Sequence, residues 1–244
     1  MPRAKVVCTL GPASEDRETV ADLVRAGMSV ARLNASHGTT EGRAALIERV
    51  RDVSERLGEP VATMLDVPGP EIRTAPLEAP VELPTGAEYR LEPGETVDGD
   101  SVGLSGSIAA AAPGDRVLLD DGRIETTVER VAGDTVVVRV DSGGELGGRK
   151  GVNVPGVDLG LEFVTEADRA ELRLAAEADV AYVATSFVGS ADDVYAVDAV
   201  LESLGADIPV VAKIERADAV ENLQGILEAA DGVMVARGLE DALE

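Results

Sequence analysis

The sequence predicts an α/β protein with a parallel sheet, interrupted by an inserted β-rich segment. Apolar runs alternate with amphipathic helical patterns from residue 4 to residue 70, and again from about residue 156 onwards. Between about residues 75 and 155 no long helical pattern occurs. Strand–helix–strand units form parallel sheets with right-handed crossovers, whereas short alternating runs separated by turns form antiparallel ones. The pattern alone leaves two arrangements open for the parallel sheet, doubly wound or a barrel.

Strand–helix units open the chain. The helical runs are bounded by cap signals: Ser14 is the expected N-cap of the first helix, and Gly27 and Gly58 are the expected C-terminal stops. Strands are expected at residues 4–10, 29–36 and 60–70, with helices at 14–27 and 39–58.

The insert and the return of the strand–helix alternation define the domains. Short alternating runs such as 115–144 are separated by turn residues, which is typical of a small antiparallel β domain. We therefore expect a parallel-sheet domain over 1–74 and 156–244, with the insert at 75–155. The later helices are expected at 165–178, 190–205 and 217–230, and the later strands at 179–187, 209–215 and 232–238, which brings the core to six strands.

The charge of the chain excludes several partners. Its 46 acidic and 22 basic residues give a formal charge of −24, yet 45% of residues are apolar and cluster periodically, which excludes a disordered chain. Lysine is scarce, tryptophan is absent, and two Phe and three Tyr are the only aromatic residues. Such a composition is typical of a protein from a cytosol kept at high salt (a halophilic protein), where ions screen self-repulsion. Nucleic acid and anionic membranes are not expected partners, because both need a basic footprint.

Cysteine and hydropathy point to a soluble, cytoplasmic protein. The single cysteine, Cys8, excludes an internal disulfide and a cysteine-based zinc cluster, and its apolar surroundings favour a buried small hydrophobe. The apolar stretch at the N-terminus is too short for a signal peptide, and no window approaches the length of a membrane span.

Polar and charged side chains follow the predicted strands at their carboxyl ends. Residues two apart on a strand share a face, so Arg32, Asn34 and, if the strand extends that far, Ser36 project to one side. Lys213 and Glu215 do the same on a later strand. A charged residue at a strand end is commonly a solvated rim position. Lys213 fits that interpretation poorly, because it directly follows an apolar run in a chain with few lysines.

Further candidates surround these strand ends. Asp66 ends the third strand and Arg73 follows in the next loop, and in a barrel such ends line a common rim where active sites lie. His37, the only histidine, could be a general base, a cap or a ligand contact. The segment around Lys150 is a flexible linker or a phosphate clamp. By chemistry alone, the set indicates a metal-assisted site for a phosphorylated anion.

Eight motifs in order resemble those of pyruvate kinase, over roughly residues 3 to 238. They are "KVVCTLGPAS", "GMSVARLNASHG", "LDVPGPEIRT", "LLDDGRI", "GGRKGVNVPG", "VATSFV", "VAKIE" and "DGVMVARG". The resemblance implies a (β/α)8 TIM barrel, here incomplete, interrupted after its third strand by a lid that is a small antiparallel β-barrel. It also implies phosphoryl transfer between phosphoenolpyruvate and ADP, giving pyruvate and ATP in glycolysis, with Mg²⁺ and K⁺. Full-length members of the family are usually homo-oligomers.

The resemblance also assigns roles by position. Lys213 would stabilise charge on the transferring phosphoryl group and the enolate, Arg32 would hold the substrate phosphate, and Gly238 would border the substrate. Glu215 would bind Mg²⁺, and Arg73 and Lys150 would neutralise nucleotide phosphates. The remaining assignments are a K⁺ site made by Asn34, Ser36, Asp66 and the Val67 carbonyl, and a nucleotide border made by Asn34, Ala35, Ser36 and His37.

Two departures from the family pattern affect the metals. Val67-Pro68 replaces the common Thr-Lys, so a K⁺ contact is retained only through the backbone, while Glu71 matches the form associated with K⁺ dependence. After Gly238 the family continues with Asp-Leu-Gly, whose Asp is the second Mg²⁺ ligand, whereas this chain continues with Leu239-Glu240-Asp241.

From the second departure we expect weak Mg²⁺ binding, unless Glu240 or Asp241 substitutes, and negligible turnover by the chain alone. From the same departure we expect this chain to lack the last two barrel strands and the C-terminal domain of the family. Three functions therefore remain: the N-terminal portion of a pyruvate kinase, a paralogue that binds phosphate or nucleotide without turnover, and a different metal-dependent barrel such as a lyase. The lid insertion argues against the third.

Overall fold

The computed structural model describes residues 4–120, 122–157, 159–236 and 239. The chain folds into two compact units. The first, called the barrel unit below, comprises Met1–Pro70 and Glu162–Glu244, and the second, called the insert unit, comprises Glu71–Leu161. The boundaries expected from the sequence, 75 and 155, lie inside the insert unit.

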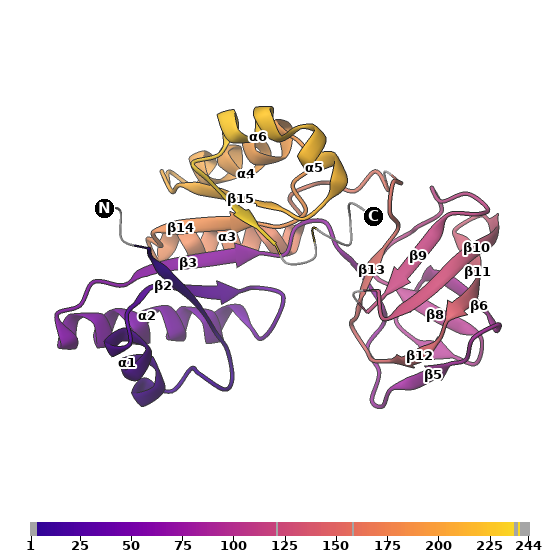
Figure 1. The fold of residues 1–244 in the computed structure, drawn as a ribbon, viewed down its shortest axis with the longest axis horizontal. Coiled ribbons are helices and arrows are strands. Elements are labelled where there is room, and N and C mark those ends of the chain that lie inside the picture. The colour runs from indigo at the N-terminus through magenta and orange to yellow at the C-terminus, as the bar shows by residue number, and fades with distance from the viewer. Residues whose placement is uncertain (1–3, 121, 158, 237–238, 240–244) are drawn as a thin grey trace. The chain divides into compact units, whose positions relative to one another are not determined.

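The barrel unit is built on six parallel strands that neighbour one another in chain order. This order, with a helical connection after most strands, is that of an α/β barrel. Figure 1 shows the sheet curling, with α1 and α2 at one end of it and α4 to α6 at the other. The strands are β1 (Val6–Leu10), β2 (Met28–Asn34), β3 (Ala62–Val67), β14 (Tyr182–Thr185), β15 (Val210–Ile214) and β16 (Gly232–Val235).

The helices of this unit follow the expected pattern, with two corrections. The first helix is capped by Asp16, whose side chain accepts the N–H groups of Glu18 and Thr19, and Ser14 instead forms a turn with Gly11. Asn222 divides the last expected helix, and its side chain donates to the Gly189 carbonyl oxygen at 2.9 Å. The helices are α1 (Arg17–Arg25), α2 (Thr40–Leu57), α3 (Glu166–Glu177), α4 (Ala191–Ser203), α5 (Ala217–Glu221) and α6 (Leu223–Ala229).

Branched aliphatic side chains form the core between sheet and helices. Val20, Ile47, Leu65 and Leu172 are fully buried there, and no aromatic residue belongs to the buried set of this cluster in the described part of the chain. Cys8 is only partly buried against this core, so the expectation of a buried cysteine was wrong. A core without aromatic side chains depends on the close fit of many small apolar groups.

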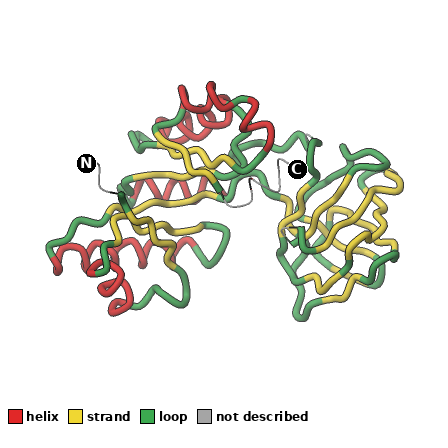
Figure 2. Tube along the Cα trace, in the orientation of Figure 1, coloured by secondary structure: helices red, strands yellow, loops and turns green. Residues whose placement is uncertain are grey.

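The insert unit is a β-barrel. Eight strands pair in the order β4-β13-β9-β10-β11-β6-β8-β7, and β5 pairs with β12. Hydrogen bonds from Ser105 N to Arg73 O and from Ala75 N to Gly103 O, both 2.8 Å, join the β4 segment to β8 and close the sheet. One pair, β6 with β8, is parallel, and the others are antiparallel. Figure 2 shows this unit as strands and loops, with the helices confined to the barrel unit.

The strands of the insert unit are short. They are β4 (Ile72–Arg73), β5 (Val81–Leu83), β6 (Glu88–Pro93), β7 (Val97–Asp98), β8 (Ser101–Leu104), β9 (Arg116–Leu119), β10 (Ile124–Ala132), β11 (Thr135–Ser142), β12 (Gly144–Leu146) and β13 (Gly151–Asn153).

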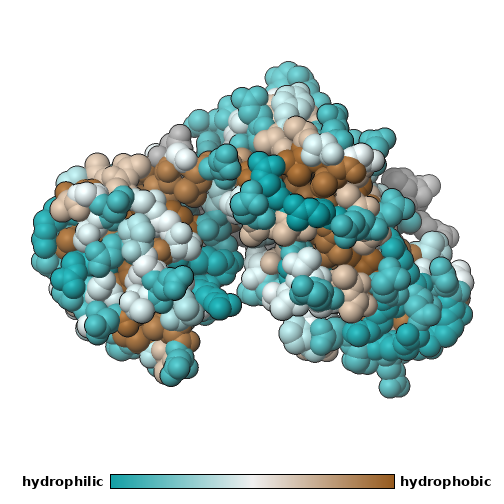
Figure 3. Space-filling model, turned by 180° about the vertical axis from the view of Figure 1, so that it is seen from behind, coloured by the Kyte–Doolittle hydropathy of each residue, from teal (hydrophilic) through white to brown (hydrophobic). Residues whose placement is uncertain are grey.

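Hydrophilic and hydrophobic residues both lie on the surface. Figure 3 shows hydrophilic residues over much of one face, with hydrophobic residues between them. On the two edge strands of the parallel sheet, Val6 and Val7 of β1 are 50% and 46% exposed and Val235 of β16 is 69% exposed. No helix among the described residues is long and apolar enough to cross a membrane.

Candidate active site

Four charged side chains meet at the carboxyl ends of β2, β3 and β15. Arg32 on β2 donates from Nε to Asp66 Oδ2 at 2.7 Å, and a second guanidinium nitrogen of Arg32 contacts the same oxygen. Lys213 Nζ on β15 lies 2.9 Å from Glu215 Oε1 and 3.6 Å from Asp66 Oδ2. The parallel register, which pairs Asn34 with Asp66 on adjacent strands, brings these ends together.

The end of β14 completes this cluster. Lys213 Nζ donates to Ser186 Oγ at 2.7 Å, and Ser186 Oγ donates to Asp66 Oδ1 at 3.3 Å. The backbone N–H of Phe187 donates to Glu215 Oε2 at 3.0 Å. One hydrogen-bonded network therefore links Arg32, Asp66, Ser186, Lys213 and Glu215; these five residues are called the strand-end cluster below.

The strand-end cluster is largely buried, and its formal charges sum to zero. Asp66 is 1% exposed and Lys213 is 11% exposed, compared with 20% for Arg32 and 18% for Glu215. Two cations and two anions give a formal sum of zero. Charges in such a partly buried place interact more strongly than charges in water. The arginine and the lysine can thus bind an anion without first losing a large hydration shell.

The residues predicted to bind K⁺ lie beside this cluster. Asn34 ends β2, and Ser36 lies beyond the strand in a turn, where its N–H donates to Asn34 Oδ1 at 3.0 Å. The Ala35 N–H donates to the Asp66 carbonyl oxygen at 2.8 Å, and the Ser186 N–H donates to that of Val67 at 3.2 Å. Asn34 and Ser36 therefore lie at and beyond the end of β2, and Asp66 and Val67 lie at the end of the adjacent β3. Oxygen donors of this kind suit a hard cation.

The loop after β2 is held by a buried ion pair. His37 is exposed, and its carbonyl oxygen accepts a hydrogen bond from Arg43 Nη1 at 2.6 Å. Arg43 Nε also donates to Glu171 Oε2 of α3 at 2.8 Å, and the two side chains are only 9% and 6% exposed. The pair connects α2 and α3 and fixes the carbonyl group of the only histidine.

Arg73 and Lys150 lie together in the insert unit. Arg73 on β4 pairs in register with Gly151, and its Nη1 donates to the Arg149 carbonyl oxygen at 2.8 Å. A second guanidinium nitrogen of Arg73 contacts Glu71, while Lys150 Nζ lies 2.7 Å from Asp120 Oδ1. The structure therefore brings these two predicted phosphate contacts together within the insert unit, each beside a carboxylate.

Mg²⁺ has one predicted protein ligand among the described residues. No group of three His, Cys, Asp or Glu side chains suited to a metal occurs within them. Gly238, Glu240 and Asp241, which bear on the substrate and on the second metal ligand, lie outside the described residues. Mg²⁺ is commonly held by one or two carboxylates together with water and substrate phosphates, so Glu215 with a phosphorylated ligand fits this ion.

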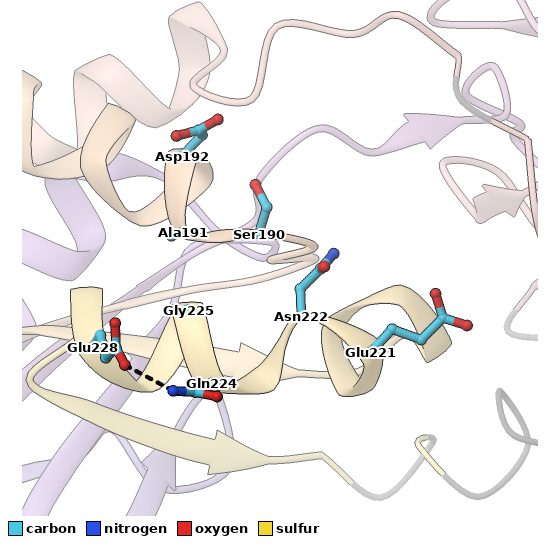
Figure 4. A pocket seen from close by; sticks show the side chains of 8 residues that line it. All are labelled: Ser190, Ala191, Asp192, Glu221, Asn222, Gln224, Gly225 and Glu228. Carbon is cyan, nitrogen blue, oxygen red and sulfur yellow. Dashed lines mark hydrogen bonds between the residues drawn. The ribbon is translucent and has the colours of Figure 1, made fainter.

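A separate pocket is chemically unsuited to a phosphorylated ligand. It has a volume of 440 Å³ and lies between the start of α4 and the helices α5 and α6. Figure 4 shows its side chains, including the carboxylates of Asp192, Glu221 and Glu228, and no basic residue lines it. Arginine and lysine side chains are the common partners of phosphate groups; the strand-end cluster contains one of each, and this pocket contains neither.

Sequence reasoning missed several members of these networks. Thr9, whose Oγ1 accepts from Arg32 Nη1 at 2.8 Å, and Ser186 are polar residues near the ends of apolar strands, which is a signal that a reader of the sequence could have used. Arg43 and Glu171 are 128 residues apart and carry no such signal.

Comparison with known proteins agrees with this arrangement. The family model "Pyruvate kinase, barrel domain" matches residues 1–241. The chain is 40% identical to pyruvate kinase of Bacillus licheniformis, 42% to that of Geobacillus stearothermophilus and 41% to that of Staphylococcus aureus. These alignments cover 98%, 97% and 98% of the chain and 42%, 41% and 42% of the relatives.

The chain thus spans about two fifths of the length of these relatives. Within that span it has the parallel strands of an α/β barrel, the β-barrel inserted after the third strand and the charged cluster at the strand ends. The chain belongs to the pyruvate kinase family, in the portion that matches the family's barrel domain.

Proposed function

We propose that this chain provides the phosphoenolpyruvate-binding part of a pyruvate kinase, which transfers a phosphoryl group to ADP and releases pyruvate and ATP in glycolysis in the cytoplasm. The observation that carries the proposal is the strand-end cluster, in which the buried Asp66 holds Arg32, and Ser186 and Glu215 hold Lys213. The fold supports the same function through its family.

The chemistry of the reaction explains why these residue types are needed. The transferring phosphoryl group passes through a loose, anionic transition state, so catalysis depends on positioned positive charge rather than on covalent steps. Arg32 would bind the phosphate of phosphoenolpyruvate, and Lys213 would neutralise charge on the phosphoryl group and on the enolate that departs from it. Asp66, which bonds Arg32 directly and Lys213 through Ser186, would link the two cations before the substrate arrives.

The metals would complete the charge balance. Glu215 would bind Mg²⁺, which when bound supplies further positive charge to the phosphoryl oxygens. Asn34, Ser36, Asp66 and the Val67 carbonyl would hold K⁺.

The remaining predicted contacts concern the nucleotide. Arg73 and Lys150 of the insert unit would neutralise its phosphates, after exchange with their present partners Glu71 and Asp120. The turn from Asn34 to His37, including Ala35 and Ser36, would border the nucleotide.

A second candidate function is the binding of phosphate or nucleotide without turnover. It is favoured by Leu239, which stands where the family has the aspartate that is its second Mg²⁺ ligand. Both functions predict that a phosphorylated ligand binds at Lys213, and they differ in the fate of that ligand.

Calorimetric titration of phosphoenolpyruvate into the 244-residue chain tests the shared claim. In MgCl₂ and high KCl we expect saturable binding that Lys213→Met and Arg32→Met each weaken at least about tenfold. Equal affinity in the wild type and in Lys213→Met would refute the assignment of the site. A coupled assay with phosphoenolpyruvate and ADP then separates the two functions. Negligible turnover is expected for this chain alone, and turnover that Lys213→Met abolishes would overturn that expectation.

A further inference from the structure

The turn after β14 contacts three of the four charged side chains of the strand-end cluster. Ser186 Oγ accepts from Lys213 Nζ at 2.7 Å and donates to Asp66 Oδ1 at 3.3 Å. The next residue, Phe187, donates its N–H to Glu215 Oε2 at 3.0 Å. A serine hydroxyl has one proton to donate and two lone pairs to accept, so both contacts of Ser186 can form at once.

The backbone of this turn is tightly constrained. Ser186 is 6% exposed, and its N–H donates to the Val67 carbonyl oxygen at 3.2 Å. Its own carbonyl oxygen lies so close to Gly69 that a Cβ there would approach to 2.7 Å. Phe187 has φ of 58°, a conformation that is costly for a bulky side chain and that is found preferentially at functional sites. The hydroxyl of Ser186 therefore has little freedom to move.

Lys213 needs such a constraint. Its ammonium group ends a flexible four-carbon chain, so it adopts one position only if its partners define that position. Glu215 and Ser186 accept two of its three N–H groups, at 2.9 and 2.7 Å, and the described residues offer the third only Asp66 at 3.6 Å. Two partners thus define the position of the nitrogen, and the third N–H has no partner closer than 3.6 Å among the described residues.

Of these two partners, Ser186 is the one suited to a purely positioning role. Glu215 is the proposed Mg²⁺ ligand, and its carboxylate must serve the metal when a metal is bound. The Ser186 hydroxyl is neutral, buried and fixed to Asp66, which itself holds Arg32. The contact can therefore set the distance between the two cations that would bind one phosphate group.

We propose that Ser186 is a positioning residue for Lys213: its hydroxyl fixes the ammonium group relative to Asp66 and Arg32 and directs the remaining N–H towards a phosphorylated ligand. The identity of that ligand as phosphoenolpyruvate rests on the function proposed above. The positioning itself is a property of the ligand-free chain.

The scarcity of lysine makes the positioning measurable. The chain contains Lys5, Lys150 and Lys213 only, so labelling with [¹³Cε]lysine gives one methylene group per site in an NMR spectrum. The two Hε protons of a lysine side chain that is fixed in one conformation have different chemical shifts. In a mobile side chain the two chemical shifts average to nearly the same value. The signals are assigned by their loss in Lys213→Met and Lys150→Met.

Three variants test the proposal. Ser186→Ala removes the hydroxyl, Ser186→Thr retains it, and Thr185→Val removes a neighbouring buried hydroxyl that has no hydrogen-bond partner among the described residues. We expect the two Hε shifts of Lys213 to merge in Ser186→Ala and to stay separate in Ser186→Thr and Thr185→Val, with an unchanged circular dichroism spectrum in all three. Separate Hε shifts in a folded Ser186→Ala would overturn the proposal, as would an equal loss in Thr185→Val.

A ligand titration distinguishes this proposal from the proposed function. With MgCl₂ present, Ser186→Ala should weaken phosphoenolpyruvate binding about tenfold, as expected for one hydrogen bond to a charged group, and Thr185→Val should not change it. One outcome is that neither the wild type nor any variant binds phosphoenolpyruvate while the Lys213 Hε shifts still merge in Ser186→Ala. In that case the proposed function fails and the positioning role stands. If phosphoenolpyruvate binds equally to wild type and Ser186→Ala, the positioning role fails and the function stands.

Discussion

The buried ion pair between Arg43 and Glu171 allows a quantitative prediction of what holds the barrel unit together. Its two side chains are 9% and 6% exposed, and they join α2 to α3 through a hydrogen bond of 2.8 Å and a second close contact. Arg43 also donates to the His37 carbonyl oxygen. Breaking the pair therefore leaves a charge in a place that water does not reach.

The expected cost follows from that burial. Removing one partner of a buried ion pair costs about 3–5 kcal/mol, whereas replacing both by apolar residues of similar volume is commonly neutral or stabilising. We expect Arg43→Met and Glu171→Leu each to lower the free energy of unfolding by about 3–5 kcal/mol. The double variant should be more stable than either single variant, with a coupling energy of about 3 kcal/mol or more.

Urea unfolding followed by circular dichroism at 222 nm measures these changes. The helices within the described residues belong to the barrel unit, so this signal reports on that unit. Asp52→Ala is the matched control, because the pair of Arg17 and Asp52 is 54% and 53% exposed and should contribute less than about 1 kcal/mol. The reasoning is refuted if the single variants lose no more than this control, or if their losses simply add in the double variant.

Three further predictions concern backbone, pH and salt. In urea unfolding, Gly69→Ala should destabilise the chain by more than Gly58→Ala does. Both glycines have a positive φ, of 70° and 68°, but only at Gly69 would a new Cβ meet a backbone oxygen at 2.7 Å. Equal losses of stability would contradict the predicted effect of this steric clash. Burial, followed by the nearby carboxylates of Asp231 and Glu202, raises the pKa of Asp198 above its ordinary value of 3.8. The folded state then favours the protonated form, so this group lowers stability as the pH rises from 3.8 through the raised pKa. Asp198→Asn should therefore raise the thermal midpoint at neutral pH and lose this advantage below pH 3.8, and a gain that grows on acidification would contradict it. Finally, the formal charge of −24 and the exposed valines on the edge strands predict a marginally stable or aggregating chain in about 0.1 M KCl. In about 3 M KCl the thermal midpoint should be higher, because salt screens the repulsion between the acidic residues. Light scattering that shows a stable monomer throughout the salt series would contradict this prediction.

The strands and the charged residues at their ends could be predicted because they depend on local sequence. Strand periodicity places Arg32, Asp66 and Lys213 at carboxyl ends, and parallel pairing brings those ends to one edge of the sheet. Their mutual contacts, such as the two hydrogen bonds that Ser186 makes, depend on side-chain directions that no periodicity determines.

Where local signals compete, the sequence pattern was not sufficient. Ser14 and Asp16 are both good N-caps, and the turn formed by Ser14 with Gly11 left Asp16 to cap the helix. The last helix carried a continuous pattern, yet the bond from Asn222 to the carbonyl group of Gly189 accompanies a break that only the tertiary structure reveals. Long-range contacts decide such cases, and they involve residues far apart in the chain.

The most direct test of the central claim uses the three lysines again. With Mg²⁺ and high KCl, phosphoenolpyruvate should move the [¹³Cε] signal of Lys213 in a saturable way, ADP should move that of Lys150, and neither should move that of Lys5. This result would place the two substrates on the strand-end cluster and on the insert unit, as proposed. A Lys213 signal that ignores phosphoenolpyruvate, or that responds only to ADP, would contradict the account.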